Sequence, residues 1–156
     1  MSKLIPGLTR RAGRFNKGNP MIGYTMNDFW KDADVIFTYT RAQAIEDGVL
    51  VDGTIGDLAE VTEQHYKWPV AMTASVFAMM EQAVNNRKHC NDYKGVWYDI
   101  LWMSRMNITR RFSESCHLFK VIITGLGRKR IHELKLVCGP GDDAEPVVTI
   151  MLPDED

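Results

Sequence analysis

The stretch YTRAQAIEDGVLVD, which begins at Tyr39, brings an aromatic ring, a guanidinium group and several carboxylates close together. Tyr39, Arg41 and Asp47, with Trp68 further along the chain, are residue types that would suit a small-ligand site in a binding protein or an enzyme. Arg41 stands out because a cation is unfavourable at the beginning of a helix. We expect Arg41 to pair with Asp34 or Asp47, and a ligand site around Arg41 is the alternative.

A second polar stretch, CGPGDDAEP, carries two adjacent carboxylates, Asp142 and Asp143. Paired carboxylates can bind a hard cation, and glycine-rich backbone can bind an anion. The alternating ligands of a calcium loop and the lysine of a phosphate loop are both missing from this stretch. Because Gly, Pro and Asp serve turns directly, we interpret it as a hairpin turn.

Histidine and cysteine side chains are the usual ligands of zinc, and they are scattered along this sequence: His65, His89, Cys90, Cys116, His117, His132 and Cys138. No pair shows the spacing of a structural zinc site. Nothing in the sequence marks an activating neighbour for a Cys–His nucleophile. We therefore expect no metal site, no cofactor and no catalytic residue.

Basic side chains form one cluster near the N-terminus and another in the last third of the chain: Arg10, Arg11, Arg14, and Arg128, Lys129, Arg130. Such clusters could bind the phosphates of a nucleic acid. A helix end with Arg105, Arg110 and Arg111 would extend the second cluster if the two lay close together. The formal net charge of −1 is unlike that of dedicated nucleic-acid binders. Nucleic-acid binding is therefore the second hypothesis.

Acidic residues dominate the C-terminal end, and tryptophans are frequent in the chain. We expect Trp97 to lie in the core. Trp102 lies off the predicted apolar stripe, but a tryptophan beside methionines on a helix favours packing over a binding site. Trp30 and Trp68 lie in or beside predicted loops, and exposed tryptophan often anchors protein interfaces. An acidic surface can steer a basic partner. The predicted partner-binding residues are Trp30, Trp68, Asp142, Asp143, Asp154, Glu155 and Asp156.

Local signals in the first half of the chain define the elements that would position these residues. The segment DVIFTYT is rich in β-branched and aromatic residues and predicts a strand. Thr40 and Gln43 form a capping-box pattern before a short helix, and Gly48 suits the left-handed residue that ends it. The segment VLVD then predicts a short strand. Asp57 and Glu60 repeat the capping-box pattern before a second helix.

Two longer helices are predicted in the middle of the chain. Apolar residues at helical spacing from Val70 to Val84 indicate a central helix that follows Pro69. The segment VWYDILWMSRMNITRRF predicts another helix, with a stripe that contains Trp97, Ile100, Leu101, Ser104 and Ile108.

The last third of the sequence changes to the period of a strand. CHLFKVIIT, IHELKLVC and VVTIML are separated by glycine-rich turns and predict a three-stranded antiparallel meander. Helices that precede such a meander are typical of α+β domains. We expect an α+β fold in which helices pack on one face of an antiparallel sheet that ends in this C-terminal meander.

The length of 156 residues fits one compact domain. We divide the chain into a basic, flexible N-terminal arm at residues 1–23 and a single α+β domain at residues 24–156. No apolar run approaches the roughly 20 residues that span a bilayer. The N-terminal stretch lacks the apolar region of a secretion signal, and three cysteines without paired spacing fit a reducing compartment. We expect a cytoplasmic protein with no membrane contact.

Three stretches together, DVIFTYTRAQAIEDGVLVD, VWYDILWM and CGPGDDAEPVVTIMLPDED, carry a resemblance to a known group of sequences. They resemble a small bacterial domain family of unknown function that is associated with plasmids, phages and other mobile elements. The resemblance covers roughly residues 32–156 and leaves the basic arm outside. It implies no activity, so no catalytic residue is carried over.

The leading hypothesis is a non-catalytic interaction protein of a phage or mobile element. The resemblance implies a host protein as the partner, with a defence system as one candidate target. Binding of nucleic acid through the arm and residues 128–130 is the first alternative. A small-ligand or enzymatic site around Arg41 is the second.

Overall fold

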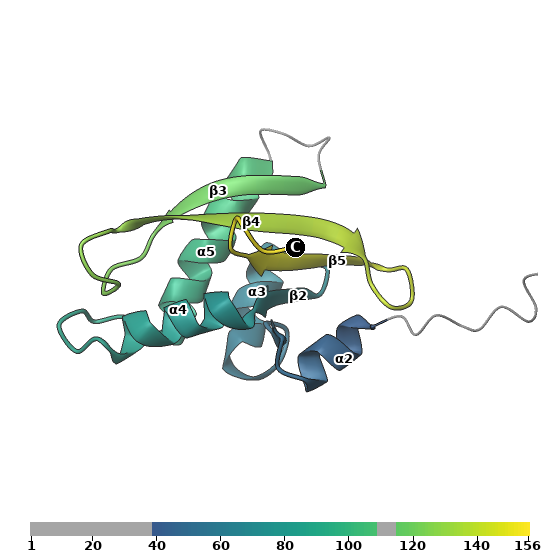
Figure 1. The fold of residues 1–156 in the computed structure, drawn as a ribbon, viewed down its shortest axis with the longest axis horizontal. Coiled ribbons are helices and arrows are strands. Elements are labelled where there is room, and N and C mark those ends of the chain that lie inside the picture. The colour runs from purple at the N-terminus through teal and green to yellow at the C-terminus, as the bar shows by residue number, and fades with distance from the viewer. Residues whose placement is uncertain (1–38, 109–114) are drawn as a thin grey trace, which may run out of the picture. The chain divides into compact units, whose positions relative to one another are not determined.

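The computed structural model describes residues 39–108 and 115–156, which belong to one compact unit, Thr38–Asp156. Several features predicted from the sequence lie outside the described residues: Trp30, Asp34, most of the predicted strand DVIFTYT, the basic arm and the boundary at residue 24. Figure 1 shows the elements, which are α2 Arg41–Glu46, β1 Leu50–Asp52, the 3-10 turn η1 Gly56–Leu58, α3 Ala59–His65, β2 Val70–Thr73, α4 Ala74–Asn85, α5 Tyr93–Ile108, β3 Cys116–Ile122, β4 Ile131–Pro140 and β5 Pro146–Met151.

The strands form one five-stranded sheet in the order β1-β2-β5-β4-β3. The C-terminal strands pair antiparallel with one another, β3 with β4 and β4 with β5, so the predicted meander is confirmed. Strand β2 pairs antiparallel with β1 but parallel with β5. The α+β class is therefore confirmed, and the sheet is larger than the meander and mixed in direction.

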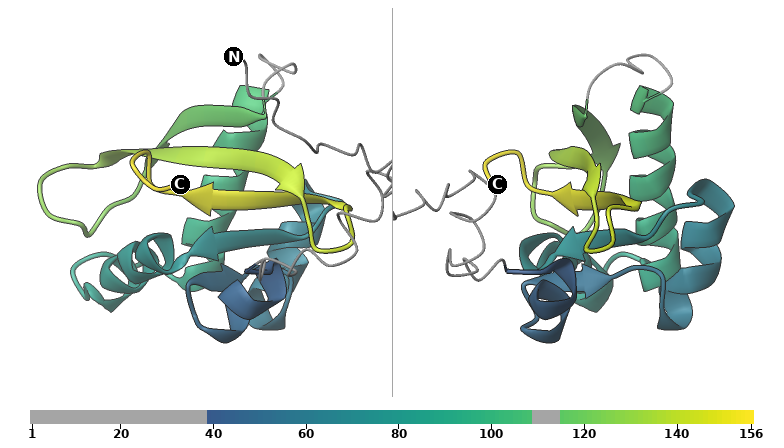
Figure 2. Two further views of the ribbon diagram at one scale, coloured as in Figure 1. Left: turned by 45° about the vertical axis from the view of Figure 1, so that its right-hand side comes forward. Right: turned by 90° about the vertical axis from the view of Figure 1, so that its right-hand side faces the viewer.

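One face of the sheet carries the hydrophobic core. Alternate residues of neighbouring strands, such as Val70 on β2 and its partner Val148 on β5, point to this face and are fully buried. Helices α3 and α5 lie over the same face (Figure 2). The fully buried ring of Trp97 on α5 donates a hydrogen bond from Nε1 to Thr62 Oγ1 at 2.9 Å. As predicted, α5 buries Trp97, Ile100, Leu101 and Ser104.

The corner that begins at Tyr39 has the predicted local structure. The Thr40 side chain accepts a hydrogen bond from the Gln43 backbone, and the Gln43 side chain accepts one from the Thr40 backbone. Gly48 has a φ of 74°, which other residues rarely adopt, and the chain then enters β1. The capping box, the glycine stop and the short strand are therefore confirmed.

The predicted beginning of the central helix at Val70 is wrong. Residues Val70–Thr73 form strand β2, and α4 begins at Ala74 with Thr73 as its N-cap. Val70, Ala71 and Met72 are all fully buried, because β2 lies between two strands and is covered on both faces. A strand covered on both faces shows no alternation of apolar and polar residues, so its sequence resembles that of a buried helix.

The second predicted capping box is also wrong. Helix α3 follows the 3-10 turn at Gly56–Leu58, and its N-cap, Leu58, makes no side-chain hydrogen bond. Asp57 lies within this turn and does not cap α3. The carboxylate that organises the preceding loop is Asp52, which accepts a hydrogen bond from the Thr54 backbone N–H at 2.7 Å.

Candidate functional site

The second face of the sheet, opposite the core, is covered over its central strands by polar contacts. Thr149 alternates with the buried Val148 along β5 and therefore points to this second face. The Arg41 guanidinium donates to Thr149 Oγ1 at 2.9 Å and to the Val148 carbonyl oxygen at 3.1 Å. Burial lowers the pKa of Arg41, while nearby carboxylates, Asp52 first among them, act in the opposite direction. Arg41 thus joins α2 to the centre of the sheet.

Of the two partners predicted for Arg41, Asp34 lies outside the described residues and Asp47 is wrong. Asp47 instead accepts a hydrogen bond from the Tyr39 hydroxyl at 2.8 Å, and this bond raises the pKa of Tyr39. Tyr39, Arg41 and Asp47 therefore do not converge on one ligand site: Tyr39 and Asp47 contact each other, and Arg41 contacts β5. The Tyr39–Asp47 contact is exposed, and the Arg41 contact is directed to β5.

Asp142 in the β4–β5 hairpin also has a structural contact. Its two carboxylate oxygens accept hydrogen bonds from the backbone N–H groups of Arg41 at 2.7 Å and Ala42 at 2.9 Å. These groups lie at the beginning of α2, where a carboxylate is favourable. The neighbouring Asp143 side chain is exposed. The predicted acidic pair therefore divides into one carboxylate that holds α2 and one that faces solvent.

The C-terminal acidic residues lie against the same covered face. Glu155 accepts hydrogen bonds from Thr73 Oγ1 at 2.8 Å and from the Leu152 backbone N–H at 2.7 Å. Burial alone would raise the pKa of Glu155, but hydrogen bonds from Ser75, Leu152 and Thr73 lower it overall. Lys135 donates to the Glu155 carbonyl oxygen and lies 3.5 Å from Asp156 Oδ1. Asp154 is exposed.

The basic residues Arg128, Lys129 and Arg130 are exposed in the loop between β3 and β4. The start of this loop is held at the end of α4, where the Asn86 side chain donates to the Gly125 carbonyl oxygen at 2.9 Å. Arg105 lies in the last turn of α5. Burial lowers the pKa of His65, and the charge of Arg105 lowers it further. Within the described residues, Arg105 and the loop residues 128–130 therefore do not form one basic patch. The other basic residues of the prediction lie outside the described residues: Arg10, Arg11, Arg14, Arg110 and Arg111.

The sheet edge at β3 differs from the covered centre because it exposes large apolar side chains. Trp102, Met103 and Met106 are exposed on α5, and Leu118, Ile122 and Ile131 are exposed on β3 and β4. We call these six residues the α5–β3 band. Their exposed fractions run from 39% for Met103 to 62% for Ile122, which is unusual for side chains of this size. Trp102 was expected to pack against its neighbours, and its ring stacks on Tyr98, but the residue stays 46% exposed.

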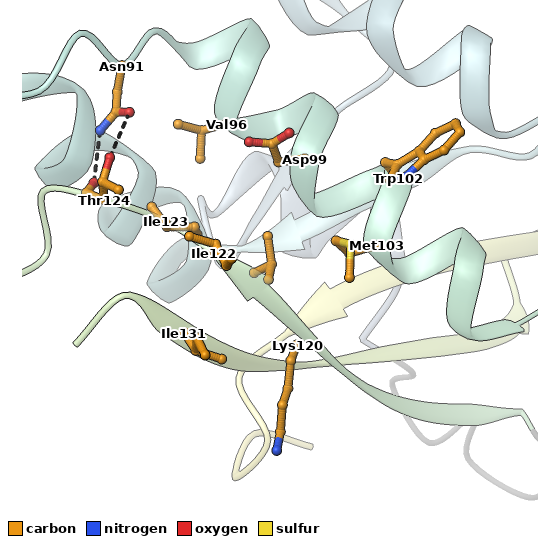
Figure 3. Close-up of a pocket in the computed structure, with 11 residues that line it drawn as sticks. Asn91, Val96, Asp99, Trp102, Met103, Lys120, Ile122, Ile123, Thr124 and Ile131 are labelled. Atoms are coloured by element: carbon orange, nitrogen blue, oxygen red, sulfur yellow. Dashed lines mark hydrogen bonds between the residues drawn. The ribbon is translucent and has the colours of Figure 1, made fainter.

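A groove runs along the band between α5 and β3 (Figure 3). Its volume is about 620 Å³, and Val96, Trp102, Met103, Ile122 and Ile131 contribute its apolar lining. A second hollow of about 440 Å³ shares Trp102, Met103 and Lys120 with it, so the two are continuous along β3. The first volume is within the range of ligand pockets, and both hollows are open to solvent.

Among the described residues that line the larger groove, Asp99 is the only carboxylate. Partial burial raises the pKa of Asp99. Two basic residues of α5 interact with α3. Lys94 Nζ lies 3.3 Å from Glu60 Oε2, and the charge of Arg105 adds to burial in lowering the pKa of His65. In the described part of the chain, no basic side chain forms an ion pair with Asp99. The groove therefore offers an exposed carboxylate beside apolar side chains, and Lys120 belongs to the same lining.

Aromatic stacking holds one wall of the band. The rings of Tyr98 and Trp102 stack with centroids 6.2 Å apart, and His65 meets the Tyr98 ring edge-on at 4.7 Å. His65 is buried, and neither of its ring nitrogens has a hydrogen-bond partner within the described residues. Burial lowers the pKa of His65, and the charge of Arg105 lowers it further.

The sequence contains a pattern that could have predicted this band. The buried stripe of α5 drew attention to the other side of that helix. Asp99, Met103 and Met106 follow one another at helical spacing on α5, on a different side from Trp97 and Ile100. Trp68, which we predicted to bind a partner, is 49% exposed in the loop before β2. It is not among the residues that line either hollow.

Metal ligation and membrane insertion are two further roles that the described residues could serve. No three His, Cys, Asp or Glu side chains there gather closely enough to hold a metal ion. None of the helices in that part of the chain has the length and apolar character that crossing a lipid bilayer requires.

Comparisons with known proteins give one match. No curated protein and no solved structure matches this chain. A family model described as "Family of unknown function (DUF6573)" matches residues 26–156, which is most of the chain and all of the described structure. The chain therefore belongs to this family of unknown function.

Proposed function

We propose that this chain is a non-catalytic interaction protein that binds another protein through the α5–β3 band. The observation that carries the proposal is the exposure of Trp102, Met103 and Ile122 together along one groove. Tryptophan and methionine are enriched in the buried centres of protein interfaces, and a large exposed apolar patch commonly marks an interaction site.

The alternative ligand site around Arg41 has less support. The Arg41 guanidinium donates to β5, and the Tyr39 hydroxyl donates to Asp47. A polar site for a small molecule needs convergent groups that are available to it. By contrast, the α5–β3 band consists of large apolar side chains that are exposed.

The proposed class of partner rests on the resemblance to a domain family that is associated with plasmids, phages and other mobile elements. A protein encoded by a phage or plasmid acts inside a host cell, so we propose that the partner is a host protein, with a defence system as one candidate. The exposed acidic residues Asp143 and Asp154 lie outside the band. They would act in steering a basic partner rather than in the main contact.

Recovery of the partner by the tagged full chain tests the proposal. The tagged protein is incubated with a host-cell lysate, and the captured complex is analysed by native mass spectrometry. We expect Trp102→Ala to weaken capture by about 30-fold, as for a typical interface hot spot. Trp68→Ala is the matched control, because Trp68 has a similar exposure but lies outside the band.

Three outcomes separate the candidate functions. Loss with Trp102→Ala and not with Trp68→Ala supports the band. The reverse result places the partner at Trp68 and contradicts the proposal. Capture of nucleic acid that is lost when Arg128, Lys129 and Arg130 become alanine, and that falls steeply with salt, establishes the nucleic-acid alternative instead.

A further inference from the structure

We infer that His65 makes binding at the α5–β3 band dependent on pH: its neutral ring holds Trp102 in the position that binds the partner, and protonation of the ring releases Trp102. This inference rests on the proposed function, because it gives the regulation of the same band. His65 is the last residue of α3, and Trp102 lies on α5 and lines both hollows of the band. The two residues therefore connect a buried titratable group to the exposed binding surface.

Three aromatic rings form this connection. Tyr98 and Trp102 lie one helical turn apart on α5, and their rings stack with an interplanar angle of 8°. The His65 ring meets both of them edge-on, with its centroid 4.7 Å from that of Tyr98 and 6.1 Å from that of Trp102. The packing of a ring from α3 against this pair therefore helps to fix the orientation of Trp102.

The place of the His65 ring suits its neutral form. The residue is only 9% exposed, and both ring nitrogens are buried without a hydrogen-bond partner within the described residues. Burying a polar group without a hydrogen bond costs free energy, and burying an ion without a partner costs more. The neighbouring aromatic rings supply no carboxylate to an imidazolium ion. The protonated ring should therefore leave this place and reach water.

The charged groups around His65 also disfavour its protonation. From α5, the positive charge of Arg105 acts on the ring and opposes a second positive charge beside it. Glu60 on α3 is paired with Lys94 of α5. The other titratable residues of η1, α3 and α5, with the two residues that follow α3, are Asp57, Glu63, Tyr66, Lys67, Tyr93, Tyr98 and Asp99. None of these side chains forms a hydrogen bond with the His65 ring.

The direction of the pH dependence follows from these contacts. Burial, and then the charge of Arg105, lower the pKa of His65 below its ordinary value of 6.5. The ring is therefore neutral at neutral pH and takes up a proton only as the pH falls below about 6.5. Because the partner would bind the neutral form, its apparent affinity should fall by up to about tenfold for each pH unit below the pKa of His65.

Nuclear magnetic resonance of the free, full-length chain tests the link between the rings. At neutral pH we expect nuclear Overhauser contacts between His65 and Tyr98 and between Tyr98 and Trp102. Both contacts should be lost as the pH falls, at the midpoint of the His65 titration. The indole N–H of Trp97, which donates to Thr62 inside the core, should keep its resonance and show that the chain stays folded. Titration of His65 with both ring contacts intact would overturn the inference.

Capture of the partner at two pH values tests the effect on binding. We expect the unchanged chain to bind the purified partner about tenfold more weakly at about pH 5 than at about pH 7.5. In His65→Phe this factor should fall toward one, because a phenyl ring fills the place and takes up no proton. His89→Phe is the matched control, since His89 lies between α4 and α5 and lines neither hollow. The same factor in His65→Phe as in the unchanged chain would overturn the inference.

Arg105→Gln keeps the test decisive if His65→Phe does not fold. It removes the charge that opposes protonation, so the midpoint for loss of the ring contacts should move to higher pH. Asp99→Asn removes the carboxylate of the groove, whose pKa burial raises, and should leave this midpoint nearly unchanged. A midpoint that moves with Asp99→Asn and not with Arg105→Gln would overturn the inference.

His117 is the competing histidine. It is also buried, and its Nδ1 has no hydrogen-bond partner within the described residues, but it lies on β3. Loss of the pH dependence of binding in His117→Phe, with the dependence kept in His65→Phe, would assign it to β3 and overturn the inference.

The same measurements distinguish this inference from the proposed function. If Trp102→Ala abolishes capture and His65→Phe keeps the pH dependence of the unchanged chain, the band binds protein but His65 does not control it. If the chain captures no host protein at either pH, the proposed function fails. The ring contacts in the free chain still decide whether protonation of His65 releases Trp102.

Discussion

The second face of the sheet has two halves that differ in their surface, the central strands β2 and β5 and the edge at β3. Over β2 and β5, polar groups from distant parts of the chain meet and satisfy one another, as with Arg41 on Thr149 and Glu155 on Thr73. Along β3, apolar side chains such as Ile122 stay exposed on this face. Beside β3 on the core side, α5 exposes Trp102 and carries Asp99, which has no ion-pair partner among the described residues. The polar residues that first suggest chemistry therefore make contacts within the fold, and we propose the apolar edge as the binding surface. The predictions below test this contrast, beginning with the largest expected effect.

Arg41→Met should cause the largest loss of stability. It keeps the aliphatic length of the side chain but leaves Thr149 Oγ1 and the Val148 carbonyl oxygen without their donor. We expect the free energy of unfolding to fall by about 2 kcal/mol, because a partly buried charged hydrogen bond is lost. Chemical denaturation measures this change. Arg128→Met is the matched control, since Arg128 is exposed in a loop. Equal stability of the two variants would contradict a structural role for Arg41.

Asp142→Ala should have a smaller effect of the same kind. It removes the carboxylate that accepts from the Arg41 and Ala42 backbone N–H groups at the beginning of α2. Loss of such a helix cap costs about 1 kcal/mol. Asp143→Ala removes the adjacent, exposed carboxylate and should change stability little. Thermal unfolding of the two variants side by side checks this difference, and an equal shift for both would count against the cap.

The stability of the protein should fall at acidic pH partly because of His65. Burial, and then the charge of Arg105, lower the pKa of His65 in the folded protein. The unfolded chain therefore binds this proton more readily, so the folded state loses stability as the pH falls below about 6.5, the ordinary pKa of histidine. Urea denaturation at neutral pH and at about pH 5.5 measures the loss. In His65→Phe the loss over this window should become smaller, and an unchanged loss would show that other groups cause it.

Ile122→Thr should have the smallest effect on stability. The side chain is 62% exposed, and threonine keeps the β-branched shape that suits a strand. We expect a change in the free energy of unfolding of less than about 0.5 kcal/mol. A larger loss in denaturant would show that the edge residues belong to the core, and the contrast between the two halves would then be wrong.

The sequence predicted local structure well because the contacts involved are close along the chain. Thr40 and Gln43 are three residues apart, and the glycine at residue 48 directly follows the short helix. The contacts that determine the role of Arg41 join it to Asp142 and Thr149, about a hundred residues away. No local pattern specifies such a contact, so the predicted pair with Asp47 was the wrong choice among nearby carboxylates.

The errors in the buried and exposed surfaces also have physical causes. Strand β2 was predicted as helix because a strand covered on both faces has no alternating pattern. Trp102 was expected to pack against its neighbours because a helix pattern shows which residues are apolar but not whether a neighbouring element covers them. In this fold α5 covers the core with Trp97, and β3 ends the described sheet beside it. The exposure of the opposite side of α5 follows from that topology.

The most direct test of the contrast compares Arg41→Met with Trp102→Ala in two measurements, thermal unfolding and capture of the host partner. We predict that Arg41→Met lowers the melting temperature and still captures the partner below that temperature. Trp102→Ala should unfold close to the unchanged protein and lose the partner. If Arg41→Met loses the partner while folded, or if Trp102→Ala keeps it, the binding surface is not the α5–β3 band.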